Sequence, residues 1–297
     1  LLSLFCAGFG SAFQHPLCST LISHAYPGNG RRAALGTYNF FGDVGKFAFG
    51  GAVSLLFVAG VPWQVPITFF GSLALACALA MLLLLQATAG RSIKPAVNAS
   101  GGEAAPSGWG IRNRRGFVAL CLIEIIDSST RTGFLTFIAF LMLAKNLPAG
   151  WAALSVPLIL IGGMAGKLAC GLLAERIGIV RTVAITEIAT GIGILLTVVL
   201  PDIAAYLLLP LIGVAVNGTS SVLYATIGDL VDPDRLPRVF GLFYTINSVT
   251  GLIVPLAFGV IGDILGVTTS IALIGMLAFV TLPLCLVLKP ALRTANA

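Results

Sequence analysis

Long apolar segments recur along almost the whole of this 297-residue chain, and they decide what it can fold into. A helix needs about 20 mostly apolar residues to cross a bilayer, and segments of that length occur roughly nine times. Only 9% of the residues are charged, whereas soluble domains carry roughly 25%, so a soluble globular enzyme is excluded. The segments are also much longer than the strands of an outer-membrane barrel. We therefore predict an all-α, polytopic membrane protein.

The predicted spans are joined by short loops, except between the third and the fourth. We expect spans at 1–25, 34–60, 65–86, 116–144, 151–174, 181–200, 203–230, 239–262 and 268–288. The long polar stretch between them, 87–115, is rich in Ala, Gly, Ser and Pro, which is typical of a flexible linker. The chain is thus divided into a first group of helices at 1–86, the linker, and a second bundle at 116–297.

Basic residues predict which ends of the spans face the cytoplasm. If the linker is cytoplasmic, 13 of the 17 Lys and Arg residues lie on the cytoplasmic side and Lys145 alone lies on the opposite side, whereas Lys46, Arg131 and Lys167 lie within spans. Such an excess is typical of cytoplasmic loops. We therefore expect the linker and the C-terminus to be cytoplasmic. The net charge of +6 then reflects topology and does not indicate binding to nucleic acid.

The first two spans resemble the seventh and eighth spans in sequence. In a gapless alignment the identities include Leu17 with Leu223, Pro27 with Pro233, Arg32 with Arg238, Tyr38 with Tyr244 and Gly45 with Gly251. Parallel repeats of this kind are typical of transporters. Spans four to six have no partner, so we expect three further spans upstream. The chain would then hold nine of twelve helices, beginning with the last three of an N-terminal bundle of six.

The loop after the fifth span carries a charged motif. It reads Gly171-Leu-Leu-Ala-Glu175-Arg176-Ile-Gly178-Ile-Val-Arg181, which resembles the G-x-x-x-(D/E)-(R/K)-x-G-x-x-(R/K) loop of the major facilitator superfamily. That loop is cytoplasmic in the family, and the basic residues place it on the same side here. The first span reads Gly8-x-Gly10-Ser11-x-x-x-His15-Pro16, which resembles the fosmidomycin-resistance-like branch and implies export.

The resemblance also implies a charge network that closes the cytoplasmic gate. Asp229, at the inner end of the seventh span, would be its acidic partner. The residues assigned to this gate are Gly171, Glu175, Arg176, Gly178, Arg181, Asp229 and Arg238. The alternative interpretation is a set of solvated surface charges, which contribute little to stability individually.

Charged residues inside the spans are functional candidates, because each costs about 2.5–3.5 kcal/mol at the centre of a bilayer. In the fourth span Glu124, Asp127, Ser128 and Arg131 share one helix face, which we expect to line the cavity between two bundles. Asp127 and Arg131 are spaced for an intrahelical ion pair. Two carboxyls beside one guanidinium leave one without a counter-charge, so either is a candidate proton carrier. Arg131 is then its partner or an anion contact, and the alternative is a structural ion pair.

The second and first spans supply the remaining candidates. Asn39, Asp43 and Lys46 share one face of the second span. Asp43 and Lys46 either neutralise each other or serve substrate binding or coupling. We favour the second reading, because their counterparts in the repeat are the apolar Val249 and Leu252.

Three further residues in the spans carry titratable groups. His15 precedes Pro16, which should kink the first span, and it is either a proton relay or a packed neutral side chain. Lys167 and Glu187 are expected to form structural pairs.

Together these features predict a secondary active transporter that works by alternating access. We expect proton antiport and export of a small, amphiphilic or anionic organic compound by a monomer in the bacterial inner membrane. Alternatives are uptake by proton symport and a non-transporting membrane sensor. The sequence contains no HExxH, GxSxG or P-loop motif of proteases, hydrolases or ATP-driven pumps. No enzyme activity, cofactor or metal is predicted.

Overall fold

The computed structural model describes residues 30–89, 108–232 and 235–295, together with the isolated positions 8, 14, 18, 21 and 22. The predicted first span at 1–25, with the candidate His15, lies outside the described ranges. Apart from one isolated antiparallel bridge between Ile111 and Val231, the regular structure that the described part contains is helical.

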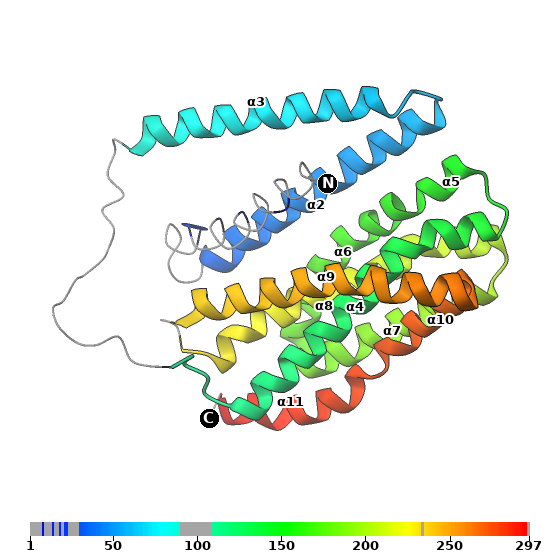
Figure 1. Ribbon diagram of the computed structural model, residues 1–297. Helices are drawn as coiled ribbons and strands as arrows, with labels where there is room; N and C mark the ends of the chain where they lie inside the picture. Colours follow the sequence, from blue (N-terminus) through cyan, green and yellow to red (C-terminus); the bar gives the residue numbers. More distant parts are fainter. Residues whose placement is uncertain are drawn as a thin grey trace.

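Helices succeed one another along the chain with short connections (Figure 1). They are α2 (Gly30–Val58), α3 (Gln64–Ala89), α4 (Arg114–Ala144), α5 (Ala149–Ala153), α6 (Ser155–Ile177), α7 (Ile179–Val199), α8 (Asp202–Leu230), α9 (Leu236–Leu265), α10 (Val267–Ala278) and α11 (Thr281–Ala295). Helix α4 begins after Asn113, whose side chain accepts a hydrogen bond from the Gly116 backbone at 2.9 Å. This N-cap satisfies one of the free amides of the first turn.

The predicted count of nine spans is not confirmed. In the described part, 7 segments are long and apolar enough to cross a membrane, and they correspond to the second, third and fifth to ninth predicted spans. Helix α4, the predicted fourth span, has 31 residues. Its charged and hydroxyl side chains make its mean hydropathy too low for it to be counted among these segments.

Two predicted spans are each built from two helices. The span predicted at 151–174 is interrupted at Leu154, between α5 and α6, and the span predicted at 268–288 is interrupted at Phe279 and Val280, between α10 and α11. A proline follows each interruption, at Pro157 and Pro283. Because proline lacks an N–H, the carbonyl four residues earlier loses its helical partner, and the helix breaks there.

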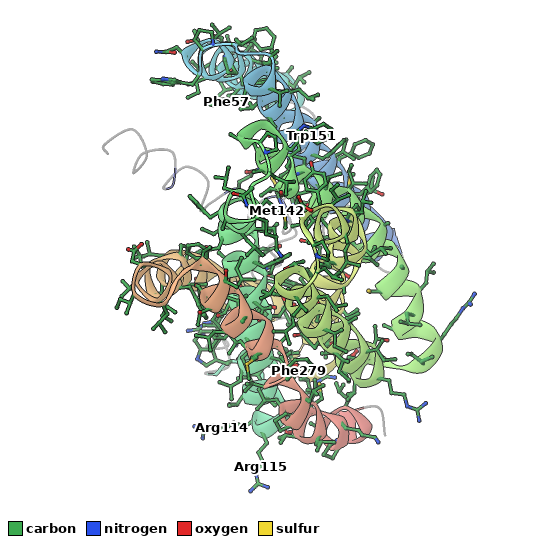
Figure 2. The ribbon with its side chains drawn as sticks, turned by 90° about the vertical axis from the view of Figure 1, so that its right-hand side faces the viewer. Phe57, Arg114, Arg115, Met142, Trp151 and Phe279 are labelled. Carbon is green, nitrogen blue, oxygen red and sulfur yellow. The ribbon has the colours of Figure 1, made fainter. Side chains whose placement is uncertain are left out.

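The helices from α4 onward pack into one bundle, and α2 and α3 lie along one side of it (Figure 1). Helix α2 contacts the bundle through α5 and α6. Phe57 of α2 and Trp151 of α5 lie at one end, and Arg114 and Arg115 extend from the opposite end of α4 (Figure 2). Most side chains of α3 are exposed apolar groups, which is the surface expected against lipid.

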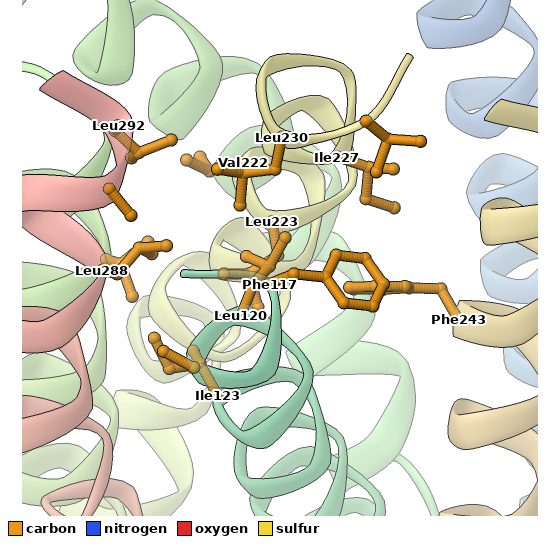
Figure 3. Packing of buried hydrophobic residues seen from close by; sticks show 14 of the residues in the cluster. Phe117, Leu120, Ile123, Val222, Leu223, Ile227, Leu230, Phe243, Leu288 and Leu292 are labelled. Atoms are coloured by element: carbon orange, nitrogen blue, oxygen red, sulfur yellow. The ribbon is translucent and has the colours of Figure 1, made fainter. Parts of the chain in front are cut away.

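Two clusters of buried apolar side chains fill the bundle. The first lies at the end where α4 begins and joins α4, α8, α9 and α11 around Leu120, Leu223 and Phe243 (Figure 3). The second lies toward the other end and joins α4, α6, α7, α8 and α10 around Phe134 and Ile194. Between the two clusters the buried side chains change from apolar to polar.

Helices α6 and α8 approach each other backbone to backbone. A Cβ atom added to Gly162 would collide with the Pro210 carbonyl, and one added to Gly166 would collide with the Val214 carbonyl. Gly162 and Gly166 form a G-x-x-x-G pair, a spacing that allows close helix contact in membranes. No side chain separates the two helices at these positions.

Candidate functional site

A buried polar layer lies between the two apolar clusters, at the same height on several helices. We define it by Glu124, Asp127 and Ser128 of α4, Thr186, Glu187 and Thr190 of α7, and Asn217, Thr219 and Ser220 of α8, all buried. On each of these helices one apolar cluster lies before the polar residues and the other after them. The layer is therefore separated from both ends of the bundle by packed side chains.

Three carboxyl groups lie in this layer with little access to water. Glu124 and Glu187 are 0% exposed and Asp127 is 3% exposed. Both oxygens of Glu124, both of Glu187 and Oδ2 of Asp127 receive no hydrogen bond from any donor in the described residues. Burying an unpaired, ionised carboxylate is very costly, so this arrangement does not suit three ionised groups.

Asp127 and Glu187 face each other from α4 and α7. Their side chains interact electrostatically, and because burying two ionised carboxylates side by side is very costly, the arrangement suits a pair in which one carboxyl holds a proton. The predicted structural pair of Glu187 does not occur among the ion pairs of the described ranges; Asp127 and Arg131 both interact with it electrostatically. The pair therefore has the composition of a proton-binding site.

Arg131 is held by α9 and not by its own helix. Its Nη2 atom donates to Oδ1 of Asn247 at 3.4 Å, and the same oxygen accepts from Ser128 Oγ at 2.6 Å. The predicted Asp127–Arg131 ion pair does not occur among the ion pairs found in the described ranges. Arg131 still interacts electrostatically with Asp127 and Glu124, so it is a neighbouring charge and not a direct partner.

The polar face of α4 is also oriented differently from the prediction. Glu124, Asp127 and Ser128 are buried among α7, α8 and α9, and only Arg131, farther along the face, is half-buried. The acidic end of this face therefore points into the bundle and not into a cavity between two bundles.

A second charged group joins α2 to α6. Asp43 contacts Lys46 of its own helix, with Nζ 3.3 Å from Oδ1, and its other oxygen, Oδ2, contacts Lys167 of α6. The contact between Asp43 and Lys46, which was the alternative to a role in binding or coupling, is present, and Lys167 is paired as expected. The three side chains are 9%, 60% and 25% exposed for Asp43, Lys46 and Lys167. One carboxylate thus serves two ammonium groups.

The remaining predicted residues are only partly described. Asn39 lies in α2, but its side chain is outside the described residues, as are His15 and the side chain of Glu175. Gly178 separates α6 from α7 with φ +91°, a conformation that other residues rarely adopt, whereas Gly171 has open space around it. Arg176 and Arg181 are exposed, so the gate network remains a prediction.

Arg238, another predicted gate residue, contacts the end of the linker. Its guanidinium lies 4.4 Å from the ring centroid of Trp109, a cation–π contact. Arg112 forms an ion pair with Asp232 at 2.9 Å, and the Ile111–Val231 bridge lies between these contacts. Residues 109–112 are therefore fixed to the connection between α8 and α9.

Sequence reasoning missed Asn247 and misjudged Glu187. Asn247 is an amide within an apolar span, three residues after Tyr244, and polar residues in spans generally face protein or water rather than lipid. That signal could have identified it. Nothing in the sequence brings Glu187 to Asp127, because the contact depends on how α4 and α7 are rotated against each other.

Apolar helices of bilayer length, with charged groups buried among them, define a multi-pass integral membrane protein. Comparison with protein families specifies the class: residues 1–209 and 120–297 match the Major Facilitator Superfamily model. The chain belongs to the major facilitator superfamily. It is a secondary transporter and not an enzyme, and it works on a small-molecule substrate across a lipid bilayer. A comparison with curated protein sequences gives no match. Among the described residues there is no group of three ligands that could hold a metal ion.

Proposed function

We propose that this transporter is coupled to protons and that the coupling site is the group formed by Glu124, Asp127 and Glu187. The observation that carries the proposal is the burial of Asp127 and Glu187 next to each other, with no hydrogen-bond donor to Asp127 Oδ2 or to either oxygen of Glu187 among the described residues. Such burial favours a bound proton. Glu124 lies one turn away and is fully buried without a donor. Arg131 supplies the neighbouring positive charge that lets the group lose this proton when a pathway to water opens.

The direction we propose is export by proton antiport. This rests on the resemblance of the first span to an exporting branch of the family. In this proposal the helices at 1–86 are the last three of one six-helix bundle and 116–297 is the other. The linker and C-terminus are cytoplasmic, and a monomer in the bacterial inner membrane moves a small organic compound by alternating access.

Infrared difference spectroscopy tests the proton site without a known substrate. The full-length protein is titrated with alkali, and the C=O stretch of a protonated carboxyl is followed. We expect this band to disappear on titration, and to be reduced in Asp127→Asn and in Glu187→Gln. Asp263→Asn, an exposed carboxyl near the end of α9, is the matched control. A band that both site variants leave unchanged would refute the assignment.

Proton flux in proteoliposomes tests coupling and direction. Candidate organic compounds are loaded inside, and an internal pH dye reports protons entering as substrate leaves. Antiport predicts acidification of the interior with wild type and with Asp263→Asn, and none with Asp127→Asn. Protons leaving together with the compound would establish symport instead. Flux that is independent of both Asp127 and Glu124 would overturn the coupling proposal.

A further inference from the structure

We infer that the cations around Asp43 bind an organic anion, and that this anion replaces Asp43 as their counter-ion. The inference rests on the proposed transport function and names its substrate class. It starts from an imbalance of charge, because Lys46 and Lys167 share the single carboxylate of Asp43. In the low-dielectric surroundings of a membrane protein, such an excess charge favours a second anion.

A third cation adds to this imbalance. Arg131 of α4 interacts electrostatically with both Lys167 and Asp43. It also interacts with Asp127 and Glu124, so part of its charge is balanced by the proton site. The positive charge that a substrate would meet comes chiefly from the two lysines, and Arg131 connects that region to the carboxyls of the polar layer.

The two lysine side chains are more exposed than the aspartate that they contact, as a binding site for anions requires. Lys46 is 60% exposed and Lys167 is 25% exposed, whereas Asp43 is 9% exposed. The two ammonium groups are therefore more accessible than the carboxylate that they share. An incoming anion meets the cations first and competes with Asp43 for them, whereas an incoming cation is repelled.

The residues come from three helices, one of which lies beside the bundle that holds the other two, and this suits a site that changes during transport. Asp43 and Lys46 belong to α2, Lys167 to α6 and Arg131 to α4. The counterparts of Asp43 and Lys46 in the internal repeat are Val249 and Leu252. The charges are thus not needed wherever this helix pattern occurs, which favours a role in binding over a role in folding.

Calorimetric binding to the full-length protein in detergent, without a pH gradient, tests this site. The probes are benzoate and phenylphosphonate, with neutral benzamide and cationic benzylammonium as matched comparisons. We expect at least one of the anions to bind about tenfold or more tightly than benzamide, as expected for one charged hydrogen bond. Equal binding of benzamide, or tighter binding of benzylammonium, would overturn the inference.

Three substitutions and one control identify the residues. Lys167→Gln should weaken binding of the anion about tenfold and Lys46→Gln severalfold. Asp43→Asn should strengthen it, because it removes the competing carboxylate. Lys289→Gln, an exposed lysine on α11, should have no effect.

The behaviour of Asp43→Asn is the decisive outcome. If that variant weakens anion binding as much as Lys167→Gln does, Asp43 is not a competitor and the inference is wrong. Should Lys167→Gln fail to fold, Lys46→Gln still decides, since its side chain is largely exposed, and unchanged affinity there would count against the site.

The outcomes also separate this inference from the proposed proton coupling. If flux does not depend on Asp127 but the protein still binds anions, the anion site is supported and the proton-coupling proposal is refuted. If flux is coupled to protons but the protein shows no preference for anions, the coupling proposal is supported and the anion site is refuted.

Discussion

The two lysines that share Asp43 allow a controlled test of how burial sets the strength of an ion pair. Lys46→Gln and Lys167→Gln make the same chemical change next to the same carboxylate. The partners differ in exposure, 60% for Lys46 and 25% for Lys167. Any difference in the free energy of unfolding therefore reports the environment of the lysine and not the chemistry of the substitution.

The expected cost of Lys46→Gln is small. At the observed 3.3 Å, Coulomb attraction in water is about 1 kcal/mol, and exposed pairs typically contribute about 0.2–1 kcal/mol. Removing one partner from a fully buried pair costs about 3–5 kcal/mol. Because Lys167 is partly exposed and Lys46 remains beside Asp43, we expect Lys167→Gln to cost about 2–3 kcal/mol.

Unfolding of the purified protein in mixed detergent–SDS micelles, followed by tryptophan fluorescence, measures both values. A double-mutant cycle with Asp43→Asn gives the coupling. The double variant Asp43→Asn, Lys167→Gln should be more stable than the sum of its single variants predicts, by about 1–2 kcal/mol. Equal costs for the two lysine variants, or a coupling near zero, would refute the argument from burial.

Further substitutions test the packing around the site. Leu223→Ala, at a fully buried position of the first apolar cluster, should cost about 2–5 kcal/mol in the same unfolding assay. Gly166→Ala places a Cβ atom against the Val214 backbone and should destabilise by about 1–3 kcal/mol. Gly228→Ala, with open space around it, should be neutral or slightly stabilising; similar losses in both glycine variants would contradict the close approach of α6 and α8. Trp109→Ala should increase the rate of trypsin cleavage at Arg238, measured by mass spectrometry, and an unchanged rate would show that the cation–π contact does not protect this site.

The sequence predicted where helices lie better than where they break. Hydropathy over a bilayer-length window placed the spans near α2 to α11, because the cost of exposing polar groups to lipid acts on every residue of a span. The breaks at Leu154 and at Phe279 depend on one missing N–H each, from Pro157 and Pro283. Both prolines are present in the sequence, but a single proline hardly changes the mean hydropathy of a bilayer-length window.

The charges were found, but their partners were not. Helical spacing correctly grouped Glu124, Asp127 and Arg131 on one face, yet the face turns toward α7 and α9, where Glu187 and Asn247 meet it. Rotation of one helix against another depends on side chains distant in sequence. The same limit applies to Lys145, whose Nζ donates to the carbonyls of Val198 in α7 and of Leu200, which caps that helix, at 3.1 and 2.6 Å. Its place opposite the linker was predictable, but its partners were not.

The contact between α6 and α8 has a mechanical consequence for the two charged groups. Lys167 follows Gly166 directly, so the ammonium that holds Asp43 sits on the segment of α6 that lies against the α8 backbone. Because no side chain separates the two backbones there, we expect α6 and α8 to move together as one rigid unit. Helix α8 also contains Thr219 and Ser220 of the polar layer. A movement of α2 that displaces Lys167 should therefore also displace the α8 residues around the buried carboxyls.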